Sequence, residues 1–84
     1  MIFGVYSIRD ALTGFMAPVC ELSDAVAVRN FSSAVSDGRP GQVMHFRPSD
    51  FSLYRIGDFD SESGSIVSFP VPSLLITAES AIGG

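Results

Sequence analysis

The sequence predicts a small α+β domain in which two antiparallel β-hairpins form one sheet and a single helix packs on one face of it, in the order ββαββ. Runs rich in β-branched and aromatic residues occur at both ends of the chain, and apolar residues at helical spacing lie between them. A length of 84 residues fits one domain with a modest core. We expect a hairpin over 1–22, a helix over 23–37, a loop over 38–50, a hairpin over 51–70, and a tail or last strand over 71–84.

The first hairpin is predicted from two strand-like runs around a turn. Ile2 to Ile8 is rich in β-branched and aromatic residues, and the turn ends at Gly14, which can adopt positive φ. The return strand, Phe15 to Glu21, contains Pro18. Because proline has no N–H for the ladder, this strand should lie at an edge of the sheet or be bulged there.

The helix is predicted to run from about Asp24 to Ser36 and to end at Asp37-Gly38. Ser23 or Asp24 is the candidate N-cap. One face collects the apolar residues at helical spacing, namely Ala27, Val28, Phe31, Ala34 and Val35. Serine and valine are indifferent helix formers, so packing on the sheet must stabilise this helix.

The loop that follows carries Gly38-Arg39-Pro40-Gly41. Loops of this length in small domains are often functional or mobile, and the two glycines would let backbone amides approach a phosphate. A phosphate-binding P-loop, however, needs Gly-Lys-Ser or Gly-Lys-Thr opening a helix after a strand, and neither is present.

The second hairpin is the clearest local prediction. Residues 51–56 alternate with a period of two, and Ser65 to Phe69 forms the partner strand. The turn from Asp58 to Gly64 begins like a calcium loop, but glycine comes one position late and Phe69 stands where a bidentate glutamate belongs, so we expect an acidic turn. We expect Pro70-Val71-Pro72 to break the strand. The run from Leu74 to Ile82 fits a short strand, a helix, or a tail that becomes ordered on a partner.

Composition restricts the function classes. The net charge of −4 argues against electrostatic binding of nucleic acid or of an anionic membrane by the protein surface as a whole. The single cysteine, Cys20, cannot form an internal disulfide, and the chain shows no secretory signal and no run of transmembrane length. We expect the protein to stay in the cytoplasm where it is made and to form a homo-oligomer, because a domain this small is marginally stable alone.

No constellation of residues reaches a catalytic motif, so we expect no enzymatic activity, no metal and no cofactor. All five cations are arginine, whose planar fork suits phosphate and base stacking. Arginine beside aromatic residues in strands is typical of single-strand binders. The candidate nucleic-acid-binding residues are Arg9, Arg39, Arg47, Tyr54 and Arg55. The alternative, in which most aromatic rings form the core, stays open.

Several segments resemble the small nonstructural protein of gokushoviruses and related Microviridae, which are phages with circular single-stranded DNA. The similar segments are Val5–Asp10, Pro18, Asp24–Phe31, Asp37, Pro48–Asp60 and Gly64–Ile66, and the match that they define spans about three quarters of the chain. The loop 38–46 and the chain after Pro70 depart from the family pattern. The resemblance implies a role like that of protein C in other microviruses, at the switch from duplex copying to single-stranded genome synthesis and packaging.

We therefore expect a non-enzymatic accessory protein of viral DNA replication in the host bacterial cytoplasm, acting through single-stranded DNA or a replication-protein complex. The alternative is a homo-oligomeric adaptor that contacts the viral initiator, host replication proteins or the procapsid without touching DNA. The two hypotheses differ in where Arg9, Arg47 and Arg55 lie. A shared solvent face favours nucleic acid, whereas scattering among carboxylates favours structural pairing.

Overall fold

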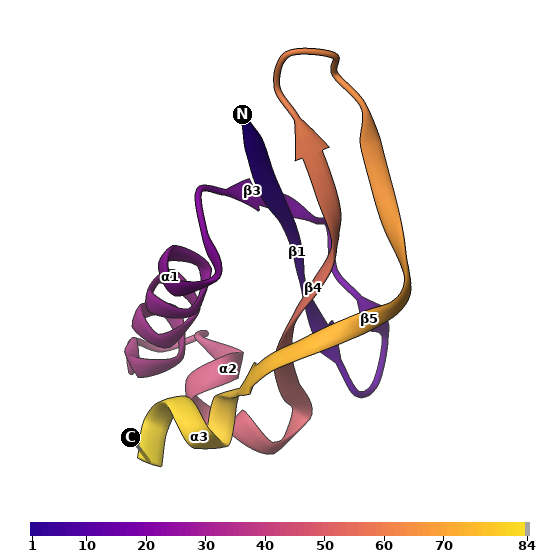
Figure 1. Cartoon of the computed structure of the whole chain (residues 1–84). Helices are drawn as coiled ribbons and strands as arrows, with labels where there is room; N and C mark the ends of the chain where they lie inside the picture. Colours follow the sequence, from indigo (N-terminus) through magenta and orange to yellow (C-terminus); the bar gives the residue numbers. More distant parts are fainter. Residues whose placement is uncertain (84) are drawn as a thin grey trace.

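The structure, a computed structural model, describes residues 1–83 and shows a curled antiparallel sheet with helices against one face (Figure 1). The strands are β1 (Ile2–Asp10), β2 (Gly14–Phe15), β3 (Val19–Glu21), β4 (Phe51–Asp60) and β5 (Ile66–Thr77). The helices are α1 (Asp24–Ser36), α2 (Val43–Phe46) and α3 (Ala78–Gly83), with a 3-10 turn, η1, at Pro48–Asp50. The α+β class is as predicted, whereas the simple ββαββ order is wrong because the described part of the chain has five strands and three helices.

The sheet has the order β2-β1-β4-β5, and β3 also pairs with β1, on the side of β2. All pairs are antiparallel, and β1 and β4 pair along nearly their full length, from Ile2 opposite Asp60 to Asp10 opposite Phe51. The predicted return strand is split in two around Pro18, which lies between β2 and β3. This edge position matches the requirement that proline avoid ladder hydrogen bonds.

The core lies between α1 and the sheet. Phe31 and Val35 of α1 are buried against Tyr6, Phe51 and Leu53 of the two central strands. The Ser23 hydroxyl accepts a hydrogen bond from the Val26 amide and caps α1, which offsets the weak helix propensity of its residues. Ala78 at the start of α3 completes this core with no exposed surface.

The β4–β5 hairpin projects beyond the core as an arm (Figure 1). The molecule measures 41 × 22 × 21 Å, and its accessible surface of 5206 Å² exceeds the roughly 4,800 Å² expected for this mass. At the base of the arm Gly57 lies so close to β5 that an added Cβ would fall 2.4 Å from the Val67 carbonyl oxygen. Glycine at this position allows the tight approach of the two strands.

The second half of the chain departs from the sequence prediction in three places. The expected loop at 38–50 contains α2 and η1, two short elements without strong propensity signals. The strand predicted to stop at Pro70 continues to Thr77. The segment 69–72 bulges away from β4, so its prolines lie where no hydrogen bond to β4 is required. The segment 71–84, predicted as a tail or one last strand, combines the end of β5 with the helix α3, and Gly84 lies outside the described residues.

Candidate functional site

The face of the sheet turned away from α1 is the principal candidate surface. Strand register places alternate residues of each strand on it, and the intervening residues point to the core. We call it the open face, and it comprises Phe3, Val5, Ser7, Arg9, Phe15, Cys20, Ser52, Tyr54, Gly57, Phe59, Ile66, Ser68, Leu74 and Thr77. Val5 and Ser7 are buried at its centre, and most of the surrounding side chains are half-buried or exposed.

Aromatic side chains form two pairs on the open face. The Phe3 and Phe59 rings lie 6.3 Å apart, and the Phe15 and Tyr54 rings meet edge to face at 5.3 Å. Beside each pair lies an aliphatic side chain of β5 that is largely exposed, Ile66 at 64% and Leu74 at 52%. Apolar groups that remain in water on one face of a small domain indicate a surface that binds something.

The charge on the open face is a single cation. Arg9 is exposed beside Phe15, its register partner on β2, and no ion pair of Arg9 occurs within residues 1–83. None of the fourteen residues is a carboxylate, although the chain is acidic overall. Arg9 and Tyr54, two of the predicted nucleic-acid-binding residues, therefore lie near each other on this face. Tyr54 is two residues along β4 from Ser52, the register partner of Arg9.

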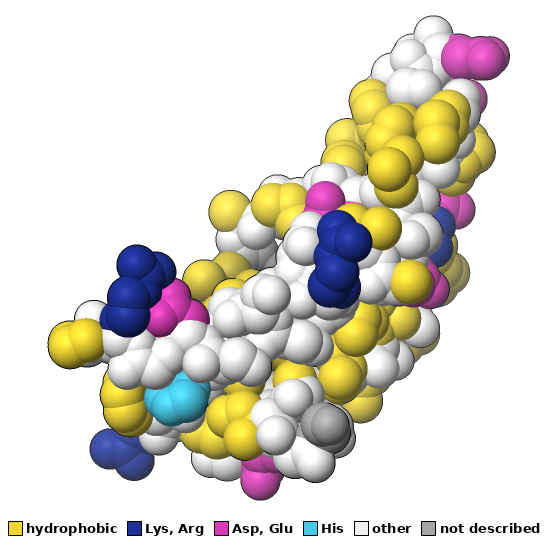
Figure 2. All heavy atoms as spheres, turned by 90° about the vertical axis from the view of Figure 1, so that its left-hand side faces the viewer, with side chains coloured by type: hydrophobic (Ala, Val, Ile, Leu, Met, Phe, Trp, Pro, Cys, Tyr) yellow, Lys and Arg dark blue, Asp and Glu magenta, His cyan; other side chains and the backbone are white. Residues whose placement is uncertain are grey.

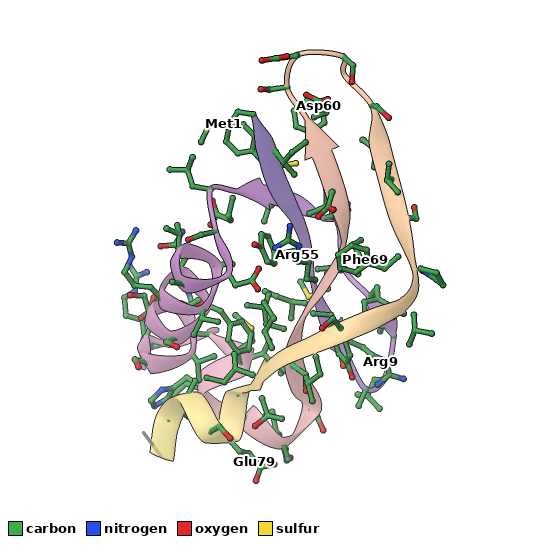
Figure 3. The ribbon with its side chains drawn as sticks, in the orientation of Figure 1. Met1, Arg9, Arg55, Asp60, Phe69 and Glu79 are labelled. Atoms are coloured by element: carbon green, nitrogen blue, oxygen red, sulfur yellow. The ribbon has the colours of Figure 1, made fainter. Side chains whose placement is uncertain are left out.

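Arg55 lies on the opposite side of the sheet in a polar cluster that joins β4 to α1. Its Nη1 donates to Asp24 Oδ1 at 2.8 Å and its Nη2 to Asp58 Oδ1 at 2.5 Å. The guanidinium carbon lies 5.7 Å from the centre of the Tyr6 ring and 5.8 Å from that of Phe69, so two rings flank it. With its side chain 24% exposed, Arg55 is occupied by structural contacts (Figure 3).

Tyr6 completes this cluster. Its hydroxyl donates to Asp24 Oδ1 at 2.6 Å, and burial, followed by this hydrogen bond, raises the pKa of Tyr6 to about 12. The same hydrogen bond, aided by Arg55, lowers the pKa of Asp24. The cluster thus fixes the N-terminal turn of α1 to the two central strands.

The other two predicted arginines lie elsewhere. Arg39 donates two hydrogen bonds from Nε and one from Nη2 to the Asp37 carboxylate, within its own loop. Arg47 is exposed between α2 and η1. Figure 2 shows the cationic side chains at separate places on the face it presents, and Figure 3 shows Arg9 well away from Arg55. The structure therefore gathers Arg9 and Tyr54 but not Arg39, Arg47 or Arg55.

The carboxylates of the predicted acidic turn are used locally. Asp58 pairs with Arg55, and Asp60 accepts the Glu62 amide and lies 3.9 Å from the terminal ammonium of Met1. Within residues 1–83 no group of three histidine, cysteine or acidic side chains could hold a metal ion. No described helix is long and apolar enough to cross a membrane.

Sequence reasoning missed most of the open face. Phe3, Phe59, Ile66 and Leu74 were not predicted to share a surface with Arg9, because that requires the register across three strands. The alternation within β4 was the available signal, but it identifies two faces without indicating which one the helix covers.

Fold and surface together define a small α+β domain with an uncovered, aromatic sheet face. The family model described as Phage ORF5 protein matches residues 3–81, and the chain belongs to this phage protein family. No curated protein and no solved structure matches the chain.

Proposed function

We propose that this phage protein is a non-enzymatic accessory of viral DNA replication that acts through protein contacts, with the open face as the contact between copies of the chain. The observation that carries the proposal is the apolar and aromatic character of a whole sheet face that lacks carboxylates. Two such faces bury apolar surface on each other without opposing negative charges. Self-association also adds buried apolar surface to the modest core of an 84-residue chain.

The arrangement of the arginines favours binding to a protein over binding to DNA. Arg39 and Arg55 are held by carboxylates, and Arg9 and Arg47 belong to different parts of the surface. Nonspecific binding of nucleic acid depends on several cations that neutralise phosphates together. Arginines that lie apart on an acidic protein supply little of that energy.

The stage of action is inferred from the resemblance to the gokushovirus nonstructural protein. On that basis the protein acts at the switch from duplex copying to single-stranded genome synthesis and packaging, in the host cytoplasm. Its partners are then the viral initiator, host replication proteins or the procapsid.

A pull-down with purified components tests this proposal. Tagged protein is mixed with the phage replication initiator, or with procapsids, and the bound fraction is compared among variants. Ile66→Asp places a charge on the open face, and Leu12→Asp places the same charge at an exposed turn outside it. We expect retention of at least one partner by the wild type, weaker retention by Ile66→Asp because a monomer contacts a partner through fewer sites than the self-associated protein, and no change with Leu12→Asp. Failure to retain any of these partners would contradict the adaptor function.

Binding of single-stranded DNA is the second candidate, and the cluster of Arg9, Phe15 and Tyr54 favours it. The two rings are in edge-to-face contact, and the arginine adjoins them with no carboxylate on the same face. Aromatic rings with a neighbouring arginine are the elements on which unpaired bases stack.

Fluorescence anisotropy of a labelled oligonucleotide tests this second candidate at about 50 mM and about 200 mM salt, since phosphate contacts weaken steeply between these conditions. Arg9→Ala should abolish binding, whereas Arg39→Ala is the matched control because Asp37 already occupies that guanidinium. Absence of binding at low salt would eliminate this candidate.

A further inference from the structure

A cavity lies on the other side of the sheet, between α1 and the edge formed by β3. Its volume is about 180 Å³. Val19 of β3 and Ala34 of α1 stand on its two sides, and Ile8, Phe31 and Leu53 are among the apolar groups that line it. Figure 1 shows the chain running from β3 into the N-terminal end of α1, and residues of both elements line the cavity.

The size of this cavity restricts its occupant. Small-molecule sites usually measure about 300–1,000 Å³, so a drug-sized ligand does not fit. An apolar cavity of about 150 Å³ holds one benzene molecule. The space therefore suits a single leucine-sized or phenylalanine-sized side chain.

The edge beside the cavity is open to another strand. β3 pairs with β1 along one side, and within residues 1–83 no strand pairs with its other side. Val19 and Cys20 are exposed. An extended peptide that hydrogen-bonds to such an edge directs alternate side chains into the space under the strand, next to the helix.

The polar lining of the cavity carries a negative charge. Among the described residues that line it, Glu21 is the one that carries a carboxyl group, and its Oε2 accepts a hydrogen bond from the side-chain amide of Asn30 in α1 at 2.6 Å. The amide orients this carboxylate, and a second lone-pair-bearing oxygen remains for a ligand. A basic residue two positions from the apolar anchor, on the same side of the peptide, therefore complements Glu21.

We propose that the groove between β3 and α1 binds an extended peptide of a partner protein, with one apolar side chain in the cavity and a basic residue two positions away beside Glu21. The inference rests on the proposed function only in that the protein acts through protein partners. It uses a different surface from the open face, so self-association and peptide capture are separable.

Titration of isotope-labelled protein followed by NMR tests the groove. The probe is a short acetylated peptide of alternating serine and threonine with a central leucine and an arginine at the second position on each side of it, so that leucine and arginine point to the same face. We expect saturable shifts of the amide resonances of Val19–Glu21 and of α1. A peptide with alanine in place of leucine should bind at least about tenfold more weakly, because the anchor contact is lost.

Two variants and a control assign the binding to the groove. Ala34→Leu fills the cavity and should weaken binding at least about tenfold, whereas Ser33→Leu, on an exposed position of the same helix, should leave it unchanged. Glu21→Gln should remove the preference for arginine over glutamate two positions from the anchor.

Absence of shifts at Val19–Glu21 with the leucine-arginine peptide at millimolar concentration would overturn the proposal. Equal binding of the alanine peptide, or unchanged binding by Ala34→Leu, would overturn it as well. The pull-down uses a substitution on the open face, so its result does not depend on whether the groove binds a peptide. If the adaptor function is wrong, the pull-down shows it and the NMR titration does not.

Discussion

Removal of the Tyr6 hydroxyl should destabilise the domain at neutral pH and make its stability less sensitive to alkaline pH. The hydroxyl is buried and donates to Asp24 Oδ1 at 2.6 Å, and a hydrogen bond to a charged group contributes about 1.5–3 kcal/mol. Tyr6→Phe should therefore lower the free energy of unfolding by about 2 kcal/mol at pH 7. That is a large part of the roughly 4–13 kcal/mol expected for a domain of this length.

The pH dependence follows from the raised pKa of Tyr6, about 12 in the folded state against 10.0 ordinarily. The folded protein holds this proton more tightly than the unfolded chain, so the stabilisation is fully present below pH 10 and is lost as the pH rises toward 12. Two pKa units correspond to about 3 kcal/mol. Urea denaturation followed by far-UV circular dichroism between pH 7 and pH 11.5 should show this extra decline in the wild type.

Tyr6→Phe is itself the control for every other group that titrates in this range. The difference in unfolding free energy between wild type and variant should shrink as the pH rises above 10. A difference that stays constant up to pH 11.5 would refute the assignment of the hydroxyl as a buried donor to Asp24.

Three further predictions concern packing and the open face. Gly57→Ala should lower the unfolding free energy, measured by urea titration, by about 1–3 kcal/mol, because its Cβ would overlap the Val67 carbonyl oxygen. The control Gly83→Ala, whose Cβ would have no atom within 4 Å, should change it by less than about 0.5 kcal/mol. Phe31→Ala should cost about 3–5 kcal/mol and abolish cooperative thermal unfolding in circular dichroism; a retained sharp transition would place the core elsewhere. The exposed Cys20 thiol should react with a disulfide reagent more slowly as protein concentration rises, because self-association covers it, and a concentration-independent rate would contradict that burial.

The first half of the fold could be predicted because local signals there agree with one another. Ser23 caps α1, its apolar residues have helical spacing, and Pro18 marks the break in the edge strand. The second half could not be predicted in the same way. Pro70 and Pro72 normally end a strand, but a bulge at the outer edge lets β5 continue past them to Thr77.

The candidate site was predictable only in part. The sequence identifies the arginines as candidate phosphate ligands, but it does not show which of them form ion pairs with carboxylates in the folded protein. Arg55 pairs with Asp24, which lies 31 residues earlier in the chain, and this contact forms only because α1 packs on the sheet. Arg9 stays available because its strand position points it to the face that the helix leaves uncovered.

Sedimentation velocity over a range of protein concentrations tests the central claim, that the open face is the contact between copies of the chain. The wild type should sediment as a species larger than 8.9 kDa that dissociates on dilution. The double variant Ile66→Asp/Leu74→Asp should remain a folded monomer, and Leu12→Asp should behave like the wild type. A wild type that stays monomeric at every concentration, or a double variant that associates as strongly as Leu12→Asp, would contradict the account.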